Sequence, residues 1–474
     1  MNVNSRDVLV LKNNYKVKVK NGRCVLETIY PYERNILTLS LIHGIIFSML
    51  DGNRCYEVLC DDISYVLGIP KEKTNELMKN FIDVFESFIE VNSGLKRSDL
   101  NSIDIARNTT VADYKTIKKD ILDNLKREPV SLVYFVTQKC GSDCIYCAVG
   151  SSYKKNSLCD DNQLNIEEIQ QLAFEARKLG FSEVELTGGD PLMHPDILRI
   201  IEIFSDVGIK VNISTKMPIT ETFINKIKNI NNLNIQISLD AIDPVLFERL
   251  TGTSKDRLKD IITSLELLSK NNIDYKVKAT ITSYNIFHIP SMVKFLHEKG
   301  CKCFHVQSYY MSQVKHNENL FPKKEDYKTF DLKMQQLMNE YKDMDFILGY
   351  DLDIINGSRK FRSVSRPYCL GGRKGMAIYE NGDFGMCGMT ANKSMRIGNI
   401  RNMTLKEAWE SENMMKMIKP TRDLFKGTLC EQCDLFDECS LKRCYLRSLI
   451  YFGTIYEIDP LCPYSKYDYK YTRN

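Results

Sequence analysis

Several features that would place this chain in a common class of protein are missing from its sequence. The longest uncharged stretch runs only from 35 to 50 and contains His43 and Gly44, so it is short and polar for a membrane span. The net charge of +4 over 474 residues is too small to indicate a nucleic-acid-binding surface. We therefore expect no membrane anchor and no nucleic-acid partner.

Export signals, repeats and histidines are also scarce. The chain starts MNVNSRDVLV, which contains no apolar signal segment, so we expect a cytoplasmic protein in a reducing compartment. Neither low-complexity tracts nor repeats of solenoid period are found. There are six histidines, and the nearest one downstream of the first cysteine group is His194. Disulfides and local histidine–metal sites are therefore not expected.

Cysteine, in contrast, is abundant, with sixteen residues. Three of them, Cys140, Cys144 and Cys147, follow the spacing C-x3-C-x2-C, with Tyr146 just before the last. Structural zinc usually takes four ligands, often as two separated pairs. Three thiolates can instead hold a [4Fe–4S] cluster that keeps one iron open for another ligand. The motif therefore predicts a cluster with an open coordination position.

From residue 130 onward, short apolar runs alternate with segments of helical periodicity. This alternation predicts a parallel sheet with right-handed crossovers, and six such units indicate an α/β fold with a partial (β/α)6 TIM-like barrel. The chemistry of such barrels lies at the carboxyl ends of the strands. The predicted strands are 130–138, 182–189, 209–215, 234–240, 275–283 and 301–309.

Polar and glycine motifs fall at these carboxyl ends. Consecutive glycines let a backbone approach a ligand closely, and a Ser and an Asp two apart on one strand face the same side and can bind ribose hydroxyls. A lone GGDP would indicate no more than a tight turn, but here it follows a strand next to the cysteine motif. The candidate residues are Gly188, Gly189 and Asp190 after the second strand, Ser214 at the third, and Ser238 and Asp240 at the fourth.

C-x3-C-x-aromatic-C after the first strand, with GGDP after the second, resembles the radical S-adenosylmethionine (SAM) enzymes over about residues 130–310. The resemblance implies that the open iron binds the amino and carboxylate groups of SAM. It also implies that Tyr146 contacts the adenine, that the two glycines meet the methionine amine, and that Ser238 and Asp240 lie near the ribose. Asp190 stands where many members carry Glu, and Lys216 stands within the position of their T-N-G motif.

Seven more cysteines lie between 369 and 462, a number that fits a single zinc site poorly. A zinc knuckle at Cys430, Cys433, Cys439 and Cys444 is one alternative. The order also resembles the SPASM domain of radical SAM peptide-modifying enzymes, with four residues between Cys439 and Cys444 where three are usual. That resemblance implies two auxiliary [4Fe–4S] clusters. The first would be held by Cys369, Cys387 and Cys444, and the second by Cys430, Cys433, Cys439 and Cys462.

The first auxiliary cluster has three cysteine ligands in this motif, because residues 304–368 contain no cysteine. We therefore hypothesise that it has an open iron or a non-cysteine ligand, and that an open iron could bind a substrate thiolate. The resemblance implies SAM and three [4Fe–4S] clusters as cofactors, and an electron donor such as flavodoxin or ferredoxin.

The N-terminal hundred residues predict a smaller domain. Residues 8–29 alternate like a hairpin with a turn at Asn21-Gly22, and 33–50, 57–69 and 71–91 are predicted helices. A hairpin with three helices resembles a winged-helix-like module, here the peptide-recognition domain of maturases of ribosomally made peptides. The predicted domains are 1–100 (peptide recognition), 101–129 (linker), 130–335 (radical SAM barrel) and 336–474 (Cys-rich SPASM domain).

These features together predict a radical SAM enzyme that modifies a ribosomally made precursor peptide, with thioether formation between a cysteine sulfur and a carbon as the leading hypothesis. No catalytic side chain is assigned. An epimerase or carbon–carbon crosslinking maturase is the runner-up, and Cys159 or Cys303 could then donate a hydrogen atom. The alternative of another class is a protein without catalytic activity that binds zinc or an iron–sulfur cluster and acts in peptide binding or in regulation.

Overall fold

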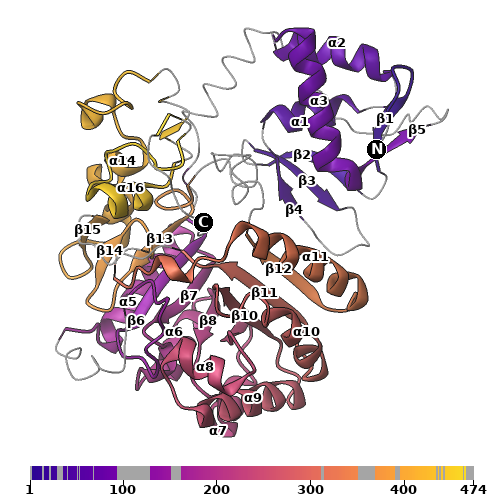
Figure 1. Cartoon of the computed structure of the whole chain (residues 1–474). Coiled ribbons are helices and arrows are strands. Elements are labelled where there is room, and N and C mark those ends of the chain that lie inside the picture. Colours follow the sequence, from indigo (N-terminus) through magenta and orange to yellow (C-terminus); the bar gives the residue numbers. More distant parts are fainter. Residues whose placement is uncertain are drawn as a thin grey trace. The chain divides into compact units, whose positions relative to one another are not determined.

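The structure is a computed structural model with two compact units, Met1–Lys126 and Arg127–Asn474 (Figure 1). Each unit is described by itself. The described residues run from 3 to 465, except for 13–14, 21–22, 29–35, 40, 51, 53, 68, 93–126, 128, 151–161, 311–313, 351–368, 390–394, 434–435, 437–438, 441–442 and 463. The predicted linker 101–129 thus falls almost entirely outside the described residues.

The larger unit is built on one curved sheet. Among the described residues it has ten strands in the order β12-β11-β10-β9-β8-β7-β6-β13-β14-β15, parallel from β12 to β13. The six predicted strands correspond to β6 to β11, which confirms the partial barrel. Their bounds are β6 Ser131–Thr137, β7 Glu183–Gly188, β8 Lys210–Thr215, β9 Leu233–Ser238, β10 Tyr275–Ile281 and β11 Cys303–Ser308.

Two further strands extend this barrel at its edges. β12 (Asp345–Gly349) pairs in parallel with β11, and β13 (Gly375–Ile378) pairs in parallel with β6. β12 lies beyond 335, so the sheet continues past the point where we expected the barrel to end. The barrel and the cysteine-rich region therefore share one continuous sheet, and the domain boundaries within this unit stay predictions.

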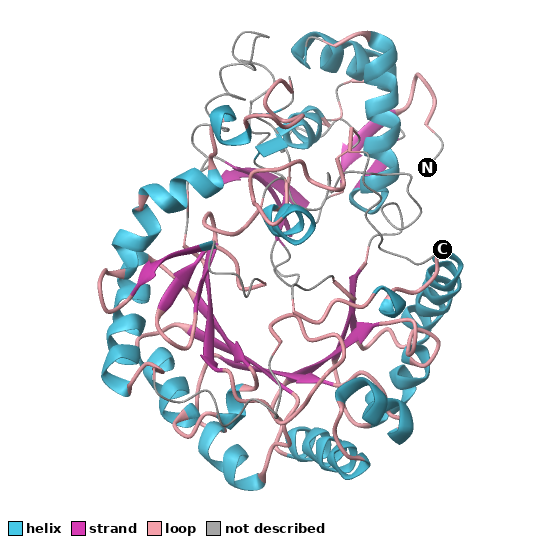
Figure 2. Cartoon of the chain, turned by 60° about the vertical axis from the view of Figure 1, so that its left-hand side comes forward, coloured by secondary structure: helices cyan, strands magenta, loops and turns pink. Residues whose placement is uncertain are grey.

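Helices cover the outer face of the sheet, as Figure 2 shows. Apolar side chains at i, i+3 and i+4 produce this packing, as in α5, where Ile169, Leu172, Ala173 and Ala176 are buried. A capping box at Asn165 and Glu168 begins that helix. The helices are α5 Ile166–Leu179, α6 Ile197–Asp206, α7 Glu221–Ile227, α8 Pro244–Thr251, α9 Lys255–Lys270, α10 Ile289–Glu298 and α11 Lys324–Glu340.

The strands alternate between an apolar outer face and a polar inner face. In β7, Val184 and Leu186 are buried toward the helices, while Glu185 and Thr187 are half-buried on the opposite face. The same alternation in β10 leaves Lys278 half-buried. A closed TIM barrel fills its interior with branched apolar side chains. Here the polar inner face leaves room for a polar ligand.

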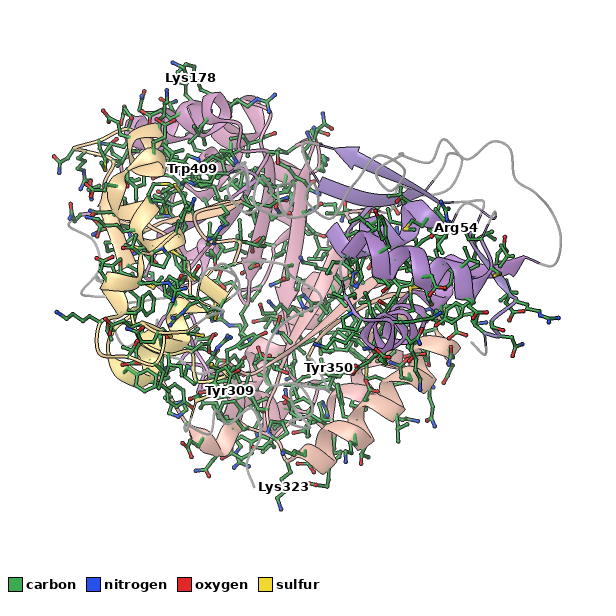
Figure 3. The ribbon with its side chains drawn as sticks, turned by 90° about the horizontal axis from the view of Figure 1, so that it is seen from above. Arg54, Lys178, Tyr309, Lys323, Tyr350 and Trp409 are labelled. Carbon is green, nitrogen blue, oxygen red and sulfur yellow. The ribbon has the colours of Figure 1, made fainter. Side chains whose placement is uncertain are left out.

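The cysteine-rich region packs on the edge of the barrel around Trp409. Its elements are β14 (Asp383–Gly385), β15 (Arg396–Asn399), α13 (Leu405–Glu410), α14 (Glu412–Ile418) and α16 (Tyr445–Phe452). The Trp409 ring meets Phe181 edge-on at 5.6 Å, and the Arg127 guanidinium stacks 4.2 Å from it (Figure 3). These interactions join the region to the barrel through one apolar core.

Among its described residues, the smaller unit has a three-stranded antiparallel sheet, a two-stranded sheet and three α-helices. β2 (Tyr15–Lys20) and β3 (Arg23–Thr28) form the predicted hairpin, although the turn residues Asn21 and Gly22 lie outside the described residues. The helices are α1 (Leu41–Met49), α2 (Tyr56–Leu67) and α3 (Lys71–Phe85). Phe47, Phe81 and Phe85 form an aromatic cluster in the core, with ring centroids 4.9–5.1 Å apart.

Two predicted helices of this unit are too long. Residues 36–38 form strand β4 beside β3, and 89–92 form strand β5, which pairs with β1 (Val8–Leu11). Both segments are as apolar as the helices they adjoin, so periodicity does not separate them. The winged-helix arrangement itself stays a prediction. None of the described helices is both long and apolar enough to cross a membrane.

Candidate functional site

The loop after β6 presents Cys140, Cys144 and Cys147 at the carboxyl end of the barrel. Its backbone is anchored to the end of α8, where Asp143 N donates to Thr251 O (2.8 Å) and Ile145 N donates to Leu250 O (3.0 Å). These bonds join the loop to an element about a hundred residues further along the chain. The protein fold itself therefore helps to hold the three cysteines in place.

A lysine from the segment after β11 binds the same loop. Lys315 Nζ lies 2.5 Å from Asp143 Oδ1 and donates to Cys144 O at 3.1 Å. A hydrogen-bonded ion pair between two distant segments restricts both, because each side chain is about three-quarters buried. Lys315 was not among the sequence-predicted residues, since a lone lysine far from any motif carries no signal.

Burial raises the pKa of Cys140 to about 12 and also raises the pKa of Cys144, where the positive charge of Lys216 opposes the shift. Both thiols are therefore protonated at neutral pH when no metal is bound. Thiolate is the form that ligates iron, so cluster binding must release these protons. The donor set, three thiols facing one cavity, fits a cluster with an open iron.

The glycine pair lets the end of β7 approach the cysteine loop. A Cβ on Gly189 would lie 2.0 Å from Lys139 O and 2.5 Å from Gln138 O, and one on Gly188 would lie 2.2 Å from Thr137 O. Gly188 also has a φ of +136°, in the region that favours glycine. A side chain at either position would displace the backbone that leads into Cys140.

Asp190 is buried, and protein groups use both of its carboxylate oxygens. Oδ1 accepts from Thr215 Oγ1 at 2.7 Å and from Leu192 N at 3.1 Å, and Oδ2 accepts from Lys216 N at 2.7 Å. Asp190 therefore ties the end of β7 to the end of β8. Its contribution to a bound cofactor is to fix these two strand ends, because its side-chain oxygens are already engaged.

Lys216, Tyr146 and Asp240 form a polar cluster in which Asp240 is buried and the other two side chains are partly buried. Lys216 Nζ donates to Tyr146 Oη at 2.8 Å and forms an ion pair with Asp240 Oδ2, to which the Tyr146 hydroxyl also donates. Asp240 Oδ1 accepts from Thr280 N at 2.8 Å. Asp240 and Tyr146 were both predicted to contact SAM, and the structure brings them together. Lys216, which replaces the usual Asn, is the unexpected third member.

Ser214 and Ser238 both line the same cavity as the three cysteines. The Ser214 hydroxyl donates to Glu185 on the adjacent strand. Burial raises the pKa of Glu185, while Ser214 and two lysines of β10 oppose that shift. These side chains give the inner face of the barrel both hydrogen-bond donors and acceptors.

The three cysteines, Tyr146, Asp190 and Lys216 line a cavity of about 280 Å³, which we call the barrel cavity. That volume is just below the range of roughly 300–1,000 Å³ that is usual for small-molecule sites. Five of the seven predicted SAM-contacting residues line it, and the exceptions are Gly188 and Asp240. Residues that the sequence did not single out also line it, at the ends of strands or in loops: Thr187, Lys278, Thr280, Gln307, Tyr309, Tyr310 and Met389.

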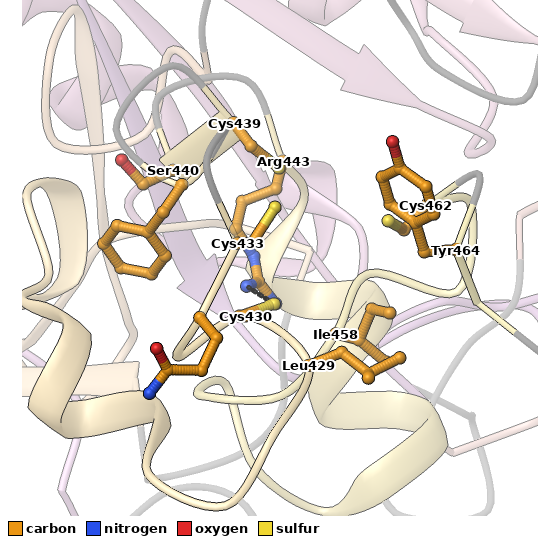
Figure 4. Close-up of a pocket in the computed structure, with 11 residues that line it drawn as sticks. Leu429, Cys430, Cys433, Cys439, Ser440, Arg443, Ile458, Cys462 and Tyr464 are labelled. Carbon is orange, nitrogen blue, oxygen red and sulfur yellow. Dashed lines mark hydrogen bonds between the residues drawn. The ribbon is translucent and has the colours of Figure 1, made fainter.

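The second group of cysteines separates into two sets in the structure. Cys430, Cys433, Cys439 and Cys462 line one cavity of about 530 Å³, the four-cysteine cavity (Figure 4). A single water occupies about 30 Å³ of liquid, so this space is far larger than one zinc ion needs. The donor set and the space fit a [4Fe–4S] cluster, as expected for the second auxiliary site.

The remaining three cysteines are electrostatic neighbours of one another. Cys369 and Cys444 raise the pKa of Cys387, and Cys444 raises that of Cys369, after the larger effect of burial. Cys444 N donates to Asp459 Oδ2 at 3.0 Å, directly before α16. The three predicted ligands of the first auxiliary site are thus brought together. Cys444 does not line the four-cysteine cavity, which argues against the zinc knuckle that includes it.

Comparisons with known proteins identify two domain families in the chain. The radical SAM superfamily matches residues 134–294, and the SPASM iron–sulfur cluster-binding domain matches residues 369–439. A probable GTP 3′,8-cyclase of Sulfurisphaera tokodaii is 29% identical over 188 residues, which are 39% of this chain and 58% of that protein. The chain therefore spans little more than half the length of that curated relative.

Two longer similarities extend beyond the barrel. The AdoMet-dependent heme synthase of Methanosarcina barkeri is 21% identical over 350 residues, which are 71% of this chain and 97% of that protein. Among solved structures, SuiB of Streptococcus suis bound to S-adenosylmethionine is similar with a TM-score of 0.60 and 16% identity, over 96% of this chain and 100% of SuiB. SuiB is also known bound to the precursor peptide SuiA. These likenesses establish the fold.

Proposed function

Because this chain is a radical SAM enzyme with an iron–sulfur-binding SPASM domain, we propose that it modifies a ribosomally made precursor peptide by forming a thioether between a cysteine sulfur and a carbon of the peptide. The leader part of the peptide would bind the N-terminal unit, and the core part would enter the barrel cavity. A fold shared along its whole length with SuiB, which binds the precursor peptide SuiA, supports a peptide substrate.

One observation supports the proposal: Cys387, a predicted ligand of the first auxiliary cluster, is hydrogen-bonded to Met389, which lines the barrel cavity. Met389 lines that cavity together with the three cysteines of the radical SAM motif, and its backbone N–H donates to Cys387 Sγ at 3.5 Å. Gly388 lies between them, and a Cβ there would lie 3.1–3.2 Å from Val133 and Phe135 of β6. A peptide held in the cavity could therefore reach both the SAM site and the first auxiliary site.

An aromatic stack holds Cys387 at this position. The Tyr379 hydroxyl donates to Cys387 O at 2.9 Å, and its ring stacks on Phe135 with centroids 5.0 Å apart and planes 12° apart. Phe135 belongs to β6, the strand that leads into Cys140. The geometry of the first auxiliary site is therefore coupled to that of the radical SAM site through one strand and one stack.

When bound, SAM and the clusters would supply the reductive cleavage to a 5′-deoxyadenosyl radical and would take up the electron left after crosslinking. The chain's own residues would orient the reactants. Lys216, Tyr146 and Asp240 would fix the SAM side of the cavity. The three-cysteine site at Cys369, Cys387 and Cys444 would leave a coordination position for the peptide sulfur. The peptide carbon would lose one hydrogen atom to the 5′-deoxyadenosyl radical, and the thiol would lose its proton. Carbon and sulfur would each give one electron to the new bond, and the second electron of the thiolate pair would pass to the auxiliary cluster.

The epimerase hypothesis gains no support from the described residues. Cys303 is the first residue of β11, whereas Gln307 near the other end of that strand lines the barrel cavity. Four residues of strand separate them by roughly 13 Å. Cys159 lies outside the described residues. Among the residues described, no cysteine other than the three cluster ligands lines the barrel cavity and could donate a hydrogen atom.

The proposal can be tested with the anaerobically reconstituted and reduced protein, SAM and a cysteine-containing precursor peptide. The exact mass of the peptide is the readout, and 5′-deoxyadenosine is measured in parallel. We expect the loss of two hydrogen atoms per crosslink, and fragmentation should locate a bond from a cysteine sulfur to a carbon. A matched peptide with each cysteine replaced by serine should keep its mass.

An unchanged peptide mass with 5′-deoxyadenosine still formed would contradict thioether formation for that peptide. Uptake of deuterium from heavy water into such a peptide, without formation of a crosslink, would then indicate epimerisation. A crosslink that persists in the serine peptide would indicate carbon–carbon bond formation instead.

A further inference from the structure

Arg443 is an arginine that is buried inside the four-cysteine cavity. It is 2% exposed and lines the cavity together with Cys430, Cys433, Cys439 and Cys462. Figure 4 shows its side chain among these cysteines. Nothing in the cysteine motif requires an arginine, because cysteine thiolates are the only ligands that a [4Fe–4S] site of this kind needs.

The hydrogen bonds of the guanidinium leave one donor without a partner. Nη1 donates to Cys430 Sγ at 3.8 Å, and Nη2 donates to Ser448 Oγ at 2.6 Å and to Glu457 O. The Nε–H is buried and has no hydrogen-bond partner among the described residues. A buried donor left unsatisfied costs about 1–3 kcal/mol, more for a charged group.

The positive charge also has no carboxylate partner among the described residues. Its neighbours are two neutral oxygens, one cysteine sulfur, and the rings of Phe425 and Tyr445, each 4.9 Å from the guanidinium carbon. Arg447, only four residues further on, is buried as well, but it pairs with Asp459 through two hydrogen bonds of 2.6–2.8 Å. Arg447 therefore has a carboxylate as its counter-charge, whereas Arg443 has none among the described residues.

A buried charge without a partner costs several kcal/mol, so a fold keeps one only where an opposite charge compensates it. Cysteine sulfur is the anion that the geometry offers. Arg443 Nη1 lies 3.8 Å from Cys430 Sγ, and the side chain lines the same cavity as all four cysteines, so its charge faces this ligand set directly.

We propose that Arg443 is a positioning residue that supplies the counter-charge of the iron–sulfur cluster in the four-cysteine cavity and donates its Nε–H to a sulfur of that cluster. Reduction adds a negative charge to the cluster, and a nearby buried cation stabilises the reduced form more than the oxidised one. Arg443 therefore raises the reduction potential of this cluster. The inference rests on the cluster assignment and does not depend on the peptide reaction.

The position of Arg443 also links the two auxiliary sites. It directly precedes Cys444, a ligand of the first site, in the segment that has one residue more than the usual spacing after Cys439. Its Nη2 holds this segment to Ser448 of α16 and to Glu457 O. One side chain thus both balances the charge of the second cluster and fixes the segment that carries a ligand of the first.

The test uses the full chain with one cluster remaining, so that each measured property belongs to that cluster. Five cysteine-to-alanine substitutions remove the other two sites, and iron, sulfide and zinc are counted before a potentiometric titration followed by electron paramagnetic resonance. Into this background we would place R443M, R443K and the control R422M. The background substitutions are at Cys140, Cys144, Cys147, Cys369 and Cys387.

We expect R443M to keep about four iron atoms per chain and to show a lower midpoint potential than the background. R443K keeps the charge but lacks the Nε–H, so its potential should lie between the two. Arg422 holds Cys433 O at 2.8 Å but is half-exposed, so water screens its charge and R422M should leave the potential close to that of the background.

An R443M protein with full iron and an unchanged potential would overturn the proposal, since arginine would then only pack the loop. If R443M loses its iron, R443K must restore it. Loss of iron in both variants would overturn charge compensation, because lysine keeps the charge. A background chain that binds zinc and no iron would overturn the cluster assignment, and this proposal with it, without bearing on SAM cleavage.

Discussion

At the scale of single residues, the most informative departure from the family pattern is Lys216. Burial is the largest single effect and would lower its pKa, but the charge and hydrogen bond of Asp240, together with Cys144 and Cys140, raise the pKa of Lys216. The ion pair is nearly inaccessible, since the two side chains are 12% and 2% exposed. Removing one partner of such a pair leaves an uncompensated buried charge.

We therefore expect K216M to be destabilised by about 3–5 kcal/mol, the usual effect of breaking a buried ion pair from one side. The double variant K216M/D240N should recover part of this loss, because the unpaired carboxylate is then neutral. Chemical unfolding of the four proteins of this cycle, under anaerobic conditions, measures the coupling. Additive effects of the two substitutions would contradict a direct interaction.

The pH dependence of stability is set in part by His305 inside the barrel. Burial, and then the charges of Lys278 and Lys276, lower its pKa from 6.5 to about 4. A base with a lowered folded pKa contributes full stability above pH 6.5, and this contribution is lost as the pH falls toward 4. We expect H305Q to lose less stability than the parent over this range. The measurement is the urea unfolding midpoint of each protein at pH 6.5 and at pH 4. An equal decrease of the midpoint in H305Q and in the parent would contradict a role of His305 in this pH dependence.

At the scale of elements, the loop after β6 depends on close backbone approach at the end of β7. Gly189 N donates to Thr137 O at 2.7 Å and Asp190 N donates to Lys139 O at 2.8 Å, so the two strand ends are hydrogen-bonded as well as closely packed. The loop that carries the cluster ligands is therefore positioned by an element that is distant from it in sequence.

We expect G189A to reduce the iron content by up to about four atoms per chain, because its Cβ would lie 2.0 Å from Lys139 O. G180A is the matched control. Gly180 ends α5 with a φ of +107° and no atom within 4 Å of its added Cβ, so this variant tests backbone strain alone. It should lose stability but keep its iron. Iron loss in both variants would show that the effect is global.

At the scale of the whole molecule, the three cluster sites lie in one compact unit, Arg127–Asn474, while the proposed leader-binding residues lie in the other. The continuous sheet from β12 to β15 joins the barrel to the cysteine-rich region. Cleavage of SAM and recognition of a leader are therefore assigned to different units.

We expect a chain that begins at Arg127 to bind about twelve iron atoms and to cleave SAM at a rate close to that of the full protein. The same chain should modify a precursor peptide much more weakly, since the leader no longer raises the local concentration of the core. Rates of 5′-deoxyadenosine formation and of peptide modification, measured side by side, test this. Unchanged peptide modification would place leader binding in the larger unit.

The sequence by itself indicated the barrel, the candidate cysteine ligands and part of the cavity lining. Between 130 and 310 the hydrophobic pattern of the strands is distinct from that of the helices, so the order of elements can be predicted from sequence. Iron–sulfur clusters are usually held by cysteines at short spacings, so candidate ligands can also be found from sequence. Periodicity failed at 36–38 and 89–92, because short apolar segments fit a strand or a helix equally well until a partner strand is known.

Only the tertiary structure decided which distant residues meet. Lys216 with Asp240, Lys315 with the cysteine loop, and Met389 with the barrel cavity join positions that are far apart in sequence. The separation of Cys444 from the four-cysteine cavity and the burial of Arg443 inside it are of the same kind. Burial and charge pairing are properties of assembled strands and loops, so the fold alone determines them.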